Sequence, residues 1–386
     1  MVKKNMQILE GSRAAAEAVV LCKPALTVAY PITPQTHIVE DIAKFIADGK
    51  LTAKHIEVES EFSAMSAAVG GSAAGSRVFT ATSSQGLALM NEVLFAASGM
   101  RLPIVMQVVN RALSAPINIW NDWQDSISAR DSGWLQLYCE TAQEVVDTTI
   151  QAYKIAEDNN ILLPIMVCMD GFFITHTLEP VELPEQKNVD KFLPKYKPTH
   201  VFLDPEKPMT QGPFAFPKPY MEMRKQLSDA VDNSDKMIKK VHDEYAKTFG
   251  RKYGNGLIDE YKNKDKKTAI ITMGSLAGTV REAVDAKDDI SLVRIRSYRP
   301  FPKKELRKAL KNADTVIILE KNIALGTGAG ALYDEVRSTF YDEDGKKKIL
   351  GVVCGIGGSE VTVEDVKDIA EISKKKKNGD IWWLMK

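Results

Sequence analysis

The sequence predicts an α/β protein built on a doubly wound parallel sheet, and three observations point to that class. Short apolar segments alternate with amphipathic segments whose apolar residues recur at helical spacing. The apolar segments are continuous rather than interrupted at every second residue, which indicates a sheet covered on both faces. Strands and helices also follow one another repeatedly, and this order favours parallel strands joined by crossover helices.

Residues 1–180 form the first predicted domain, in which strands and helices alternate. The predicted strands are residues 26–30, 55–58, 77–82, 103–109 and 162–169. The predicted helices are residues 11–22, 36–48, 61–74, 86–98 and 142–158. This order is typical of a doubly wound sheet with a helical layer on each face.

Residues 181–265 have a different character and are predicted to connect two domains. Prolines are frequent up to about residue 220 and prevent regular structure across most of that stretch. A charged helical run follows over residues 221–254. Its simpler interpretation is a solvated helix lying over the sheet, and the alternative is an arm that reaches a partner.

Residues 266–386 repeat the strand–helix pattern and form a second, smaller α/β domain. The predicted strands are residues 268–275, 291–302, 314–321 and 348–355. The predicted helices are residues 303–312, 330–340 and 362–375. The last of these helices begins with Thr362 and Asp365, which have the spacing of a capping box.

Length and composition are those of a globular protein with two or three domains. The 386 residues include 51 Lys and Arg against 51 Asp and Glu, and this zero net charge argues against a general nucleic-acid binder. The four cysteines lie far apart, without any CxxC pair. Their spacing excludes a disulfide framework and argues against any iron–sulfur or structural zinc site built from this chain alone.

No targeting or membrane segment is predicted. Glu10, Arg13 and Glu17 interrupt the apolar stretch near the start, which argues against a signal peptide and favours an amphipathic helix. No window contains the roughly 18 apolar residues needed to cross a bilayer. We therefore expect a cytoplasmic protein with neither a membrane nor a nucleic acid among its partners.

The clearest signal for a site is the set of polar loops that follow the predicted strands of the first domain. In open parallel sheets, ligands bind beyond the carboxyl ends of the strands. The loops at these ends are residues 30–35, 59–61, 83–86 and 110–111. They bring a hydroxyl group, two carboxylates, an amide and a guanidinium to one edge, which predicts a binding site there.

Three side chains at this edge have both a structural and a functional interpretation. Thr33 lies between two prolines that stiffen its loop, and a rigid turn without a ligand would explain it equally well. The forked donors of Arg111 suit a carboxylate or phosphate, and the alternative is a buried ion pair with Glu59 or Asp122. Glu61 opens a helix, where an acid is commonly present only because it complements the helix dipole.

Several strings of residues across these loops resemble one family. The strings in the first domain are AYPITPQT (29–36), VESEFSAMSAA (58–68), TATSSQGLALMNE (80–92), LPIVMQVVNRALSAP (102–116) and WNDWQDSISARDSGW (120–134). Together with ITMGSLAGTVREAVD (271–285) and VRIRSYRPFP (293–302), they resemble the α subunits of the 2-oxoacid:ferredoxin oxidoreductase family, and the pyruvate branch above all. The resemblance covers essentially the whole chain, and YPITP followed by the SE pair is specific.

The resemblance implies a fold and a chemical role for particular residues. The first domain is similar to the pyrimidine-binding domain of thiamine diphosphate enzymes, and the second is similar to the transketolase C-terminal domain. By this resemblance Glu61 hydrogen-bonds N1′ of the cofactor's aminopyrimidine, which favours the imino tautomer that removes the C2 proton. Thr33 and Arg111 match residues that hold the carbonyl and carboxylate of the 2-oxoacid. Ser84 and Gln85 are assigned to the neighbourhood of the cofactor.

The implied activity is the reversible oxidative decarboxylation of pyruvate with coenzyme A, which gives acetyl-CoA, CO₂ and reduced ferredoxin. This chain lacks the GDG motif that binds diphosphate and Mg²⁺ in such enzymes, since Asp170-Gly171 and Gly379-Asp380 do not have that arrangement. The resemblance therefore implies a thiamine diphosphate shared with a β subunit, and Mg²⁺ and iron–sulfur clusters held by partner subunits. The implied partners are the β subunit, a γ subunit, a ferredoxin-like δ subunit and ferredoxin itself.

Three alternatives to this function stay open, and one of them is a scaffold subunit without a catalytic role. Paralogues that act on 2-oxoisovalerate or 2-oxoglutarate share the YPITP and SE motifs. A nucleotide-dependent dehydrogenase is the second alternative, because Gly326–Gly330 nearly matches the GxGxxA fingerprint. The next strand lacks the ribose-binding acid, so a tight strand–helix loop is the simpler interpretation.

The histidines show no spacing typical of a metal site, and we predict that each is structural. They are His37, His55, His176, His200 and His242. Since the cysteines are scattered as well, the sequence predicts that the chain carries no metal site of its own.

Overall fold

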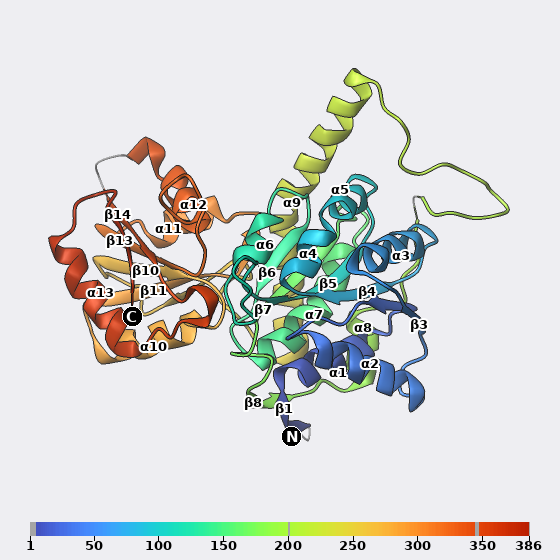
Figure 1. Ribbon diagram of the computed structural model, residues 1–386, viewed down its shortest axis with the longest axis horizontal. Helices are drawn as coiled ribbons and strands as arrows, with labels where there is room; N and C mark the ends of the chain where they lie inside the picture. The colour runs from blue at the N-terminus through green and yellow to red at the C-terminus, as the bar shows by residue number, and fades with distance from the viewer. Residues whose placement is uncertain (1–4, 200, 344–346, 386) are drawn as a thin grey trace.

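The computed structural model describes residues 5–199, 201–343 and 347–385, and these fold around two parallel sheets (Figure 1). The larger sheet lies on the right of the view and is formed mainly by the first half of the chain. The smaller sheet lies on the left and is formed by the last third. The α/β class predicted from the sequence is therefore confirmed.

The first sheet has the strand order β12-β6-β7-β5-β4-β2-β3, and its neighbours are parallel except for β12 and β6. Its strands are β2 (Leu26–Ala29), β3 (Lys54–Glu57), β4 (Val78–Thr82), β5 (Ile104–Asn110), β6 (Leu135–Tyr138), β7 (Ile165–Asp170) and β12 (Ser297–Arg299). The central strands β4 and β5 are buried along their whole length, as continuous apolar strands between two helical layers should be.

Each face of the first sheet carries its own layer of helices. One layer is α1 (Gly11–Cys22), α2 (Thr36–Ala47) and α7 (Ala142–Ala156), which share one apolar core. The opposite layer is α3 (Glu61–Ala73), α4 (Ser84–Leu89), α5 (Asn91–Gly99) and α6 (Gln124–Ser128), which belong to a second core. That second core continues into the other sheet, so the two sheets share one apolar interior.

The second sheet has the order β15-β14-β13-β10-β11-β9, with β9 antiparallel to β11 and the other neighbours parallel. Its strands are β9 (Ile258–Tyr261), β10 (Thr268–Thr272), β11 (Ile290–Ile295), β13 (Thr315–Glu320), β14 (Lys348–Val353) and β15 (Ile381–Trp383). Its helices are α10 (Leu276–Ala286), α11 (Lys303–Ala309), α12 (Ala331–Thr339), α13 (Val363–Lys375) and the 3₁₀ turns η1 (Tyr341–Glu343) and η2 (Ile356–Gly358). The predicted capping box at Thr362 and Asp365 is present at the start of α13.

The remaining elements connect the two sheets. The strands β1 (Met6–Glu10) and β8 (Leu178–Glu182) form an antiparallel pair, and α8 (Gln186–Phe192) follows. The long helix α9 (Pro217–Phe249) buries Ile238, Val241 and Tyr245 against the body, whereas its first turns project outward (Figure 1). Its second half therefore covers the first domain, as in the simpler interpretation of the charged run, while its beginning forms a protruding arm.

The structure differs from the sequence prediction at several places. The helix predicted over 86–98 is two helices, α4 and α5, with the buried Met90 between them. Strand β6 was not predicted. The strand predicted over 291–302 is divided, because β11 belongs to the second sheet and β12 crosses to the edge of the first. In addition, β9 pairs with the second sheet although its residues fall within 181–265.

Buried ion pairs join the two domains along a boundary that we call the interdomain seam. Arg294 lies near the end of β11, and Arg296 is the first residue after that strand. Both side chains donate to the carboxylate of Glu144 on α7. One of these bonds joins Arg294 Nη2 and Glu144 Oε1 at 3.0 Å. Burial by itself raises the pKa of Glu144, but the two guanidinium groups outweigh it and lower the pKa to about 2.

A second contact of the seam centres on Asp170 at the end of β7. Its carboxylate accepts hydrogen bonds from Trp123 Nε1 at 2.9 Å, from the backbone N–H of Ser275 at 3.1 Å and from Lys321 Nζ at 3.3 Å. Lys321 also donates to Asn121.

Within the described ranges, no helix is long and apolar enough to cross a bilayer.

Candidate functional site

The predicted site residues follow four neighbouring strands at one edge of the first sheet. Thr33 lies in the loop after β2, Glu61 begins α3 after β3, Ser84 and Gln85 begin α4 after β4, and Arg111 follows β5. Since these strands are parallel, their carboxyl ends meet at the same edge. We call this group the strand-end cluster.

Arg111 joins the first and last of these loops. Its Nη1 donates to the backbone carbonyl of Thr33 at 2.9 Å, and its Nε donates to the carbonyl of Asn118 at 3.0 Å. Neither Glu59 nor Asp122 pairs with it in the described structure, so the alternative of a buried ion pair is wrong. Burial lowers the pKa of Arg111, although the nearby Asp125 carboxylate raises it. Its Nη2 is left without a protein partner among the described residues, and a carboxylate could occupy that position.

Glu61 is buried at the first position of α3, with 7% of its surface exposed. Ser60 caps the helix, since its hydroxyl accepts from the N–H of Ser63 at 3.3 Å. The carboxylate of Glu61 makes no hydrogen bond to any other described side chain or backbone group. By contrast, the neighbouring Glu59 is exposed, and its carboxylate already accepts from the Ser63 hydroxyl.

Gly86 brings the start of α4 against Glu61. A β-carbon at this position would lie 2.6 Å from Glu61 Oε1 and 2.5 Å from Thr82 Oγ1, so only glycine fits. The hydroxyl groups of Thr82 and Ser83 are buried here and have no hydrogen-bond partner. Ser72 Oγ and Tyr153 Oη, among other buried atoms of the described residues, lack partners as well, so these two hydroxyl groups fit a bound group without requiring one.

Asp125 on α6 positions the loops of the strand-end cluster. Its carboxylate accepts from the N–H groups of Ser84 at 2.9 Å and Arg111 at 3.0 Å, and from Asn110 Nδ2 at 2.8 Å. Burial raises its pKa to about 7, against the opposing effect of these N–H donors. Asp125 lies within the WNDWQDSISARDSGW string, but no local signal showed that it binds the ends of β4 and β5 together.

Ser84 and Gln85 contact the loop after β5 rather than open space. Ser84 has a positive φ of 48°, and its hydroxyl donates to the carbonyl of Ala112. Gln85 donates to the hydroxyl of Ser114. A strained serine held in this way is typical of functional sites, and the assignment of both residues to cofactor binding stays a prediction.

These residues fit the aminopyrimidine end of thiamine diphosphate. That ring needs an acid for N1′ and polar groups for its amino side, and the site offers the unpaired carboxylate of Glu61 beside the unpaired hydroxyl groups of Thr82 and Ser83. The one Asp-Gly pair at the end of a first-sheet strand is Asp170-Gly171, and the structure uses Asp170 in the interdomain seam. Asp170 is therefore not placed to bind a diphosphate-bound metal ion.

The glycine-rich loop after β13 does not offer a phosphate site. The carboxylate of Glu320 accepts from the N–H groups of Leu332 at 2.9 Å and Tyr333 at 3.3 Å, which are the donors at the start of α12. A β-carbon on Gly330 would lie 2.0 Å from that carboxylate. The glycine thus makes room for Glu320, and the helix terminus that a pyrophosphate would use is already occupied.

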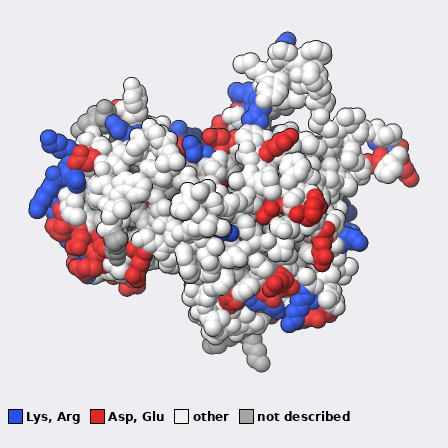
Figure 2. Space-filling model, viewed as in Figure 1, with Lys and Arg blue, Asp and Glu red and all other residues white. Residues whose placement is uncertain are grey.

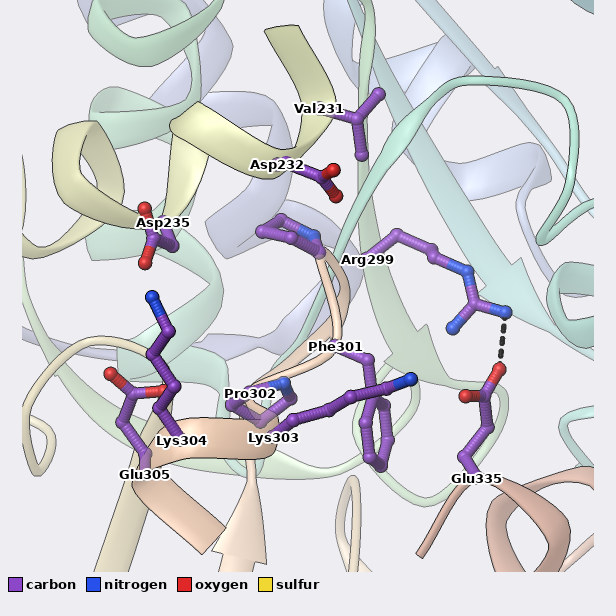
Figure 3. Close-up of a pocket in the computed structure, with 11 residues that line it drawn as sticks. Val231, Asp232, Asp235, Arg299, Phe301, Pro302, Lys303, Lys304, Glu305 and Glu335 are labelled. Atoms are coloured by element: carbon purple, nitrogen blue, oxygen red, sulfur yellow. Dashed lines mark hydrogen bonds and ion pairs between the residues drawn. The ribbon is translucent and has the colours of Figure 1, made fainter. Parts of the chain in front are cut away.

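A separate hollow of about 520 Å³ lies between α9 and the β12–α11 loop (Figure 3). Arg299, Lys303, Lys304 and several acids line it, and Arg299 pairs with Glu335 at 2.6 Å. None of its lining residues belongs to the strand-end cluster. Figure 2 shows a surface with few charges in the middle of the view. The loop that follows Arg111 exposes the apolar side chains of Ile117 and Trp120.

Comparison with known proteins gives two family matches along the chain. Residues 17–243 match the model described as "Pyruvate flavodoxin/ferredoxin oxidoreductase, thiamine diP-bdg". Residues 267–366 match the "Pyruvate:ferredoxin oxidoreductase core domain II". The first match covers more than half of the chain and includes every residue of the strand-end cluster.

Individual relatives extend these matches to nearly full length. The chain is 50% identical over 384 residues to pyruvate synthase subunit PorA of Methanocaldococcus jannaschii, covering 98% of each chain. It is 43% identical over 373 residues to ketoisovalerate oxidoreductase subunit VorA of Pyrococcus horikoshii, covering 96% of this chain and 94% of the relative. Among solved structures, 2-oxoglutarate:ferredoxin oxidoreductase from Magnetococcus marinus has a TM-score of 0.73 at 20% identity, and this chain spans 66% of it.

Proposed function

Because the chain belongs to the pyruvate:ferredoxin oxidoreductase family, we propose that it supplies the aminopyrimidine-binding and substrate-binding half of a shared active site. The complete enzyme converts pyruvate and coenzyme A into acetyl-CoA and CO₂, reversibly, with reduction of ferredoxin. One observation carries this proposal. The buried Glu61 carboxylate, without a protein partner, lies at the sheet edge where Arg111 holds the Thr33 loop.

Glu61 is the acid that acts on the cofactor. When bound, thiamine diphosphate supplies the carbanion-stabilising group that allows CO₂ to leave a 2-oxoacid. The Glu61 carboxyl group holds a proton at N1′ of the aminopyrimidine, and its burial strengthens that hydrogen bond. Gly86 lets the Glu61 side chain pack directly against the start of α4, which fixes the position of the carboxyl group.

Thr33 and Arg111 bind the substrate. The guanidinium is fixed by two backbone carbonyls, so it presents its remaining Nη2 donor in a defined direction. A charge-assisted hydrogen bond from this donor to the 2-oxoacid carboxylate orients the substrate. The Thr33 side chain is exposed at the same edge and donates to the substrate carbonyl.

The other half of the site belongs to a partner. We assign the diphosphate to a β subunit, and Mg²⁺ and the iron–sulfur clusters to partner subunits of a complex that also contains γ and ferredoxin-like δ subunits and passes electrons to ferredoxin. All four cysteines of this chain are buried free thiols, so they offer no cluster ligands. Free thiols also suit the reducing cytoplasm, where we place the complex. Ile117, 78% exposed beside Arg111, and Trp120 are apolar surface that the β subunit covers.

Pyruvate is the substrate that we favour over 2-oxoisovalerate and 2-oxoglutarate. Identity is higher to the pyruvate synthase relative than to the ketoisovalerate oxidoreductase relative, at 50% against 43%. The likeness to the 2-oxoglutarate enzyme, at 20% identity, concerns the fold alone.

The test is reconstitution of the assembled enzyme. The isolated chain should be colourless and inactive, and addition of its partner subunits should produce 2-oxoacid- and coenzyme A-dependent reduction of a dye or ferredoxin. Turnover should be fastest with pyruvate when the three 2-oxoacids are compared at equal concentration. Faster turnover of another 2-oxoacid would contradict the substrate assignment, and activity of the isolated chain would contradict the shared site.

A further inference from the structure

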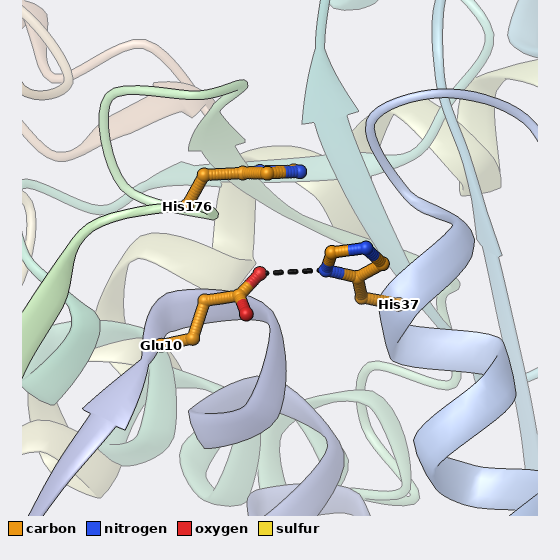
Figure 4. Close-up of side chains that lie close together, drawn as sticks. All are labelled: Glu10, His37 and His176. Carbon is orange, nitrogen blue, oxygen red and sulfur yellow. Dashed lines mark hydrogen bonds and ion pairs between the residues drawn. The ribbon is translucent and has the colours of Figure 1, made fainter.

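Three metal-ligating side chains that are distant in the sequence meet on the surface of the first domain (Figure 4). They are Glu10 at the end of β1, His37 in the first turn of α2 and His176 in the loop between β7 and β8. One ligand atom from each lies within 4.8 Å of the other two. None of the three belongs to the strand-end cluster, and the proposed function gives the group no role.

The backbone around these residues holds them in place. Glu10 stands opposite Leu178 in the β1–β8 pair, so His176 is only two residues from the position facing it. The N–H and hydroxyl of Ser12 both donate to the carbonyl of Thr175 at 3.1 Å. A β-carbon at Gly11 would lie 2.1 Å from the carbonyl oxygen of Ile174, so the start of α1 packs directly on this loop.

Neighbouring side chains fix the orientation of the His176 ring, and the His37 ring packs against it. The Thr175 hydroxyl bonds Nδ1 of His176 at 2.7 Å, which leaves the other ring nitrogen for a ligand. Phe172 packs against the His176 ring with centroids 4.7 Å apart and is supported in turn by Trp120 at 4.5 Å. His37 lies across from His176 with ring centroids 4.9 Å apart.

Glu10 and His37 share a hydrogen bond of 2.7 Å between Oε1 and Nδ1, drawn as the dashed line in Figure 4. A hydrogen bond between Glu10 and His37 would not by itself explain why the His176 ring lies beside them. Zinc ligands stand about 2.0–2.2 Å from the ion, so two of them are roughly 3.3 Å apart in a tetrahedral site. Both side chains are partly exposed, at 48% for His37 and 30% for Glu10, and small rotations about their side-chain bonds provide that spacing.

We propose that Glu10, His37 and His176 bind one zinc-class divalent ion, with water in the fourth position. Two imidazoles and a carboxylate form a ligand set typical of Zn²⁺. The ion replaces the proton shared by Glu10 and His37 and ties β1, α2 and the β7–β8 loop together. The spacing of histidines in the sequence predicts no metal site, because spacing cannot show a site assembled from three separate elements.

The experiment is a titration of the purified full-length chain with Zn²⁺ by calorimetry, and with Co²⁺ by visible absorption. We expect saturation at a single ion per chain and the absorption bands of a four-coordinate Co²⁺ site. Glu10→Gln, His37→Asn and His176→Asn should each weaken binding by roughly 10–100-fold or more. The matched controls Glu40→Gln, one turn further along α2, and His55→Asn should bind as the unchanged chain does.

A second measurement needs no variant and so remains decisive if a substitution disturbs folding. Zn²⁺ should protect His37 and His176, but not His55, from modification by diethyl pyrocarbonate, as read by mass spectrometry of the peptides. It should also slow amide hydrogen exchange in residues 5–13 and 171–178. Lack of saturable binding, equal binding by the ligand variants, or protection confined to other histidines would each overturn the proposal.

Discussion

The strand-end cluster and the interdomain seam both contain buried acidic and basic side chains, but their carboxylates differ in how they are hydrogen-bonded. In the seam, Glu144 is bonded by two arginines, and Asp170 is bonded by an indole, a backbone N–H and a lysine. In the cluster, Glu61 accepts no hydrogen bond from the described residues, and the hydroxyl groups of Thr82 and Ser83 nearby are buried without a partner. Charge and burial are therefore shared by the two regions, and they differ in whether the acid at the centre of each is paired: the two seam carboxylates are, although Arg294 Nε is left without a partner, and that of Glu61 is not.

This difference has an energetic basis. A buried polar group without a partner costs about 1–3 kcal/mol, and more if it is charged. A fold keeps such groups when a ligand restores their hydrogen bonds. Substitutions in the seam should therefore act on stability, whereas substitutions in the cluster should act on catalysis and leave stability nearly unchanged.

The sharpest test of the cluster is Glu61→Gln in the assembled enzyme. Loss of the acid that serves N1′ should lower kcat by roughly 10²–10⁴-fold, since this is the contribution of a positioned acid or base. Steady-state turnover with pyruvate and coenzyme A measures it. Glu59→Gln is the matched control, because that carboxylate is exposed and already bound to Ser63, and it should keep nearly full turnover. Near-normal turnover of Glu61→Gln would place the site elsewhere.

The sharpest test of the seam is Glu144→Ala. It leaves Arg294 and Arg296 buried without their carboxylate, and removing one partner of a buried pair costs about 3–5 kcal/mol. Urea denaturation of the purified chain measures the loss. Asp229→Ala removes one partner of the exposed Lys225 pair on α9 and should change stability by less than about 1 kcal/mol. Equal effects of the two substitutions would contradict the distinction drawn between the regions.

The seam should also weaken in acid. The pKa of Glu144 is about 2 in the folded chain against an ordinary value of 4.5, so its contribution to stability is complete above pH 4.5. It is lost as the pH falls from 4.5 towards 2 and amounts to at most about 3 kcal/mol. Denaturation midpoints across this range should fall less steeply for Glu144→Gln than for the unchanged chain. If the midpoints of the two proteins fell equally with pH, protonation of Glu144 would not contribute to the loss of stability between pH 4.5 and 2.

The smallest of these effects is expected for Arg111→Met. Loss of one charge-assisted hydrogen bond to the substrate carboxylate should raise KM for the 2-oxoacid by roughly 10–100-fold. The KM for coenzyme A should change little, and thermal stability should be close to that of the unchanged enzyme. Arg111→Lys keeps the charge but not the fork that bonds Thr33 and Asn118, so it should recover part of the loss. An unchanged KM would remove Arg111 from the substrate site.

Local pattern was enough to predict the strands of the first domain and the loops that follow them. Continuous apolar segments marked β2, β4, β5 and β7, and the parallel order then placed Thr33, Glu61, Ser84 and Arg111 at one edge. The roles of these residues stay predictions, since they came from a resemblance. The partner of Arg111 could not be predicted, because its two backbone carbonyls belong to loops whose shape no side-chain pattern records.

Contacts between residues far apart in the chain could not be predicted from the sequence. Glu144 and Arg294 are 150 residues apart, and nothing in either segment indicates the other. The same is true of Glu320, whose carboxylate fills the helix terminus that its glycine-rich loop would otherwise offer to a nucleotide. The short strand β12 was merged with β11 because a three-residue strand at a sheet edge has no periodic signal of its own.

The position of strand β12 means that the first sheet cannot be completed by a fragment that lacks the second half of the chain. This strand comes from the second half of the chain but forms the edge of the first sheet, where Ser297 pairs with Leu137. A fragment that ends before the second sheet would uncover the N–H and C=O groups of β6, a fully buried strand. Exposed apolar edges recruit other chains. Such a fragment should aggregate on expression, so the two halves must be produced as one polypeptide.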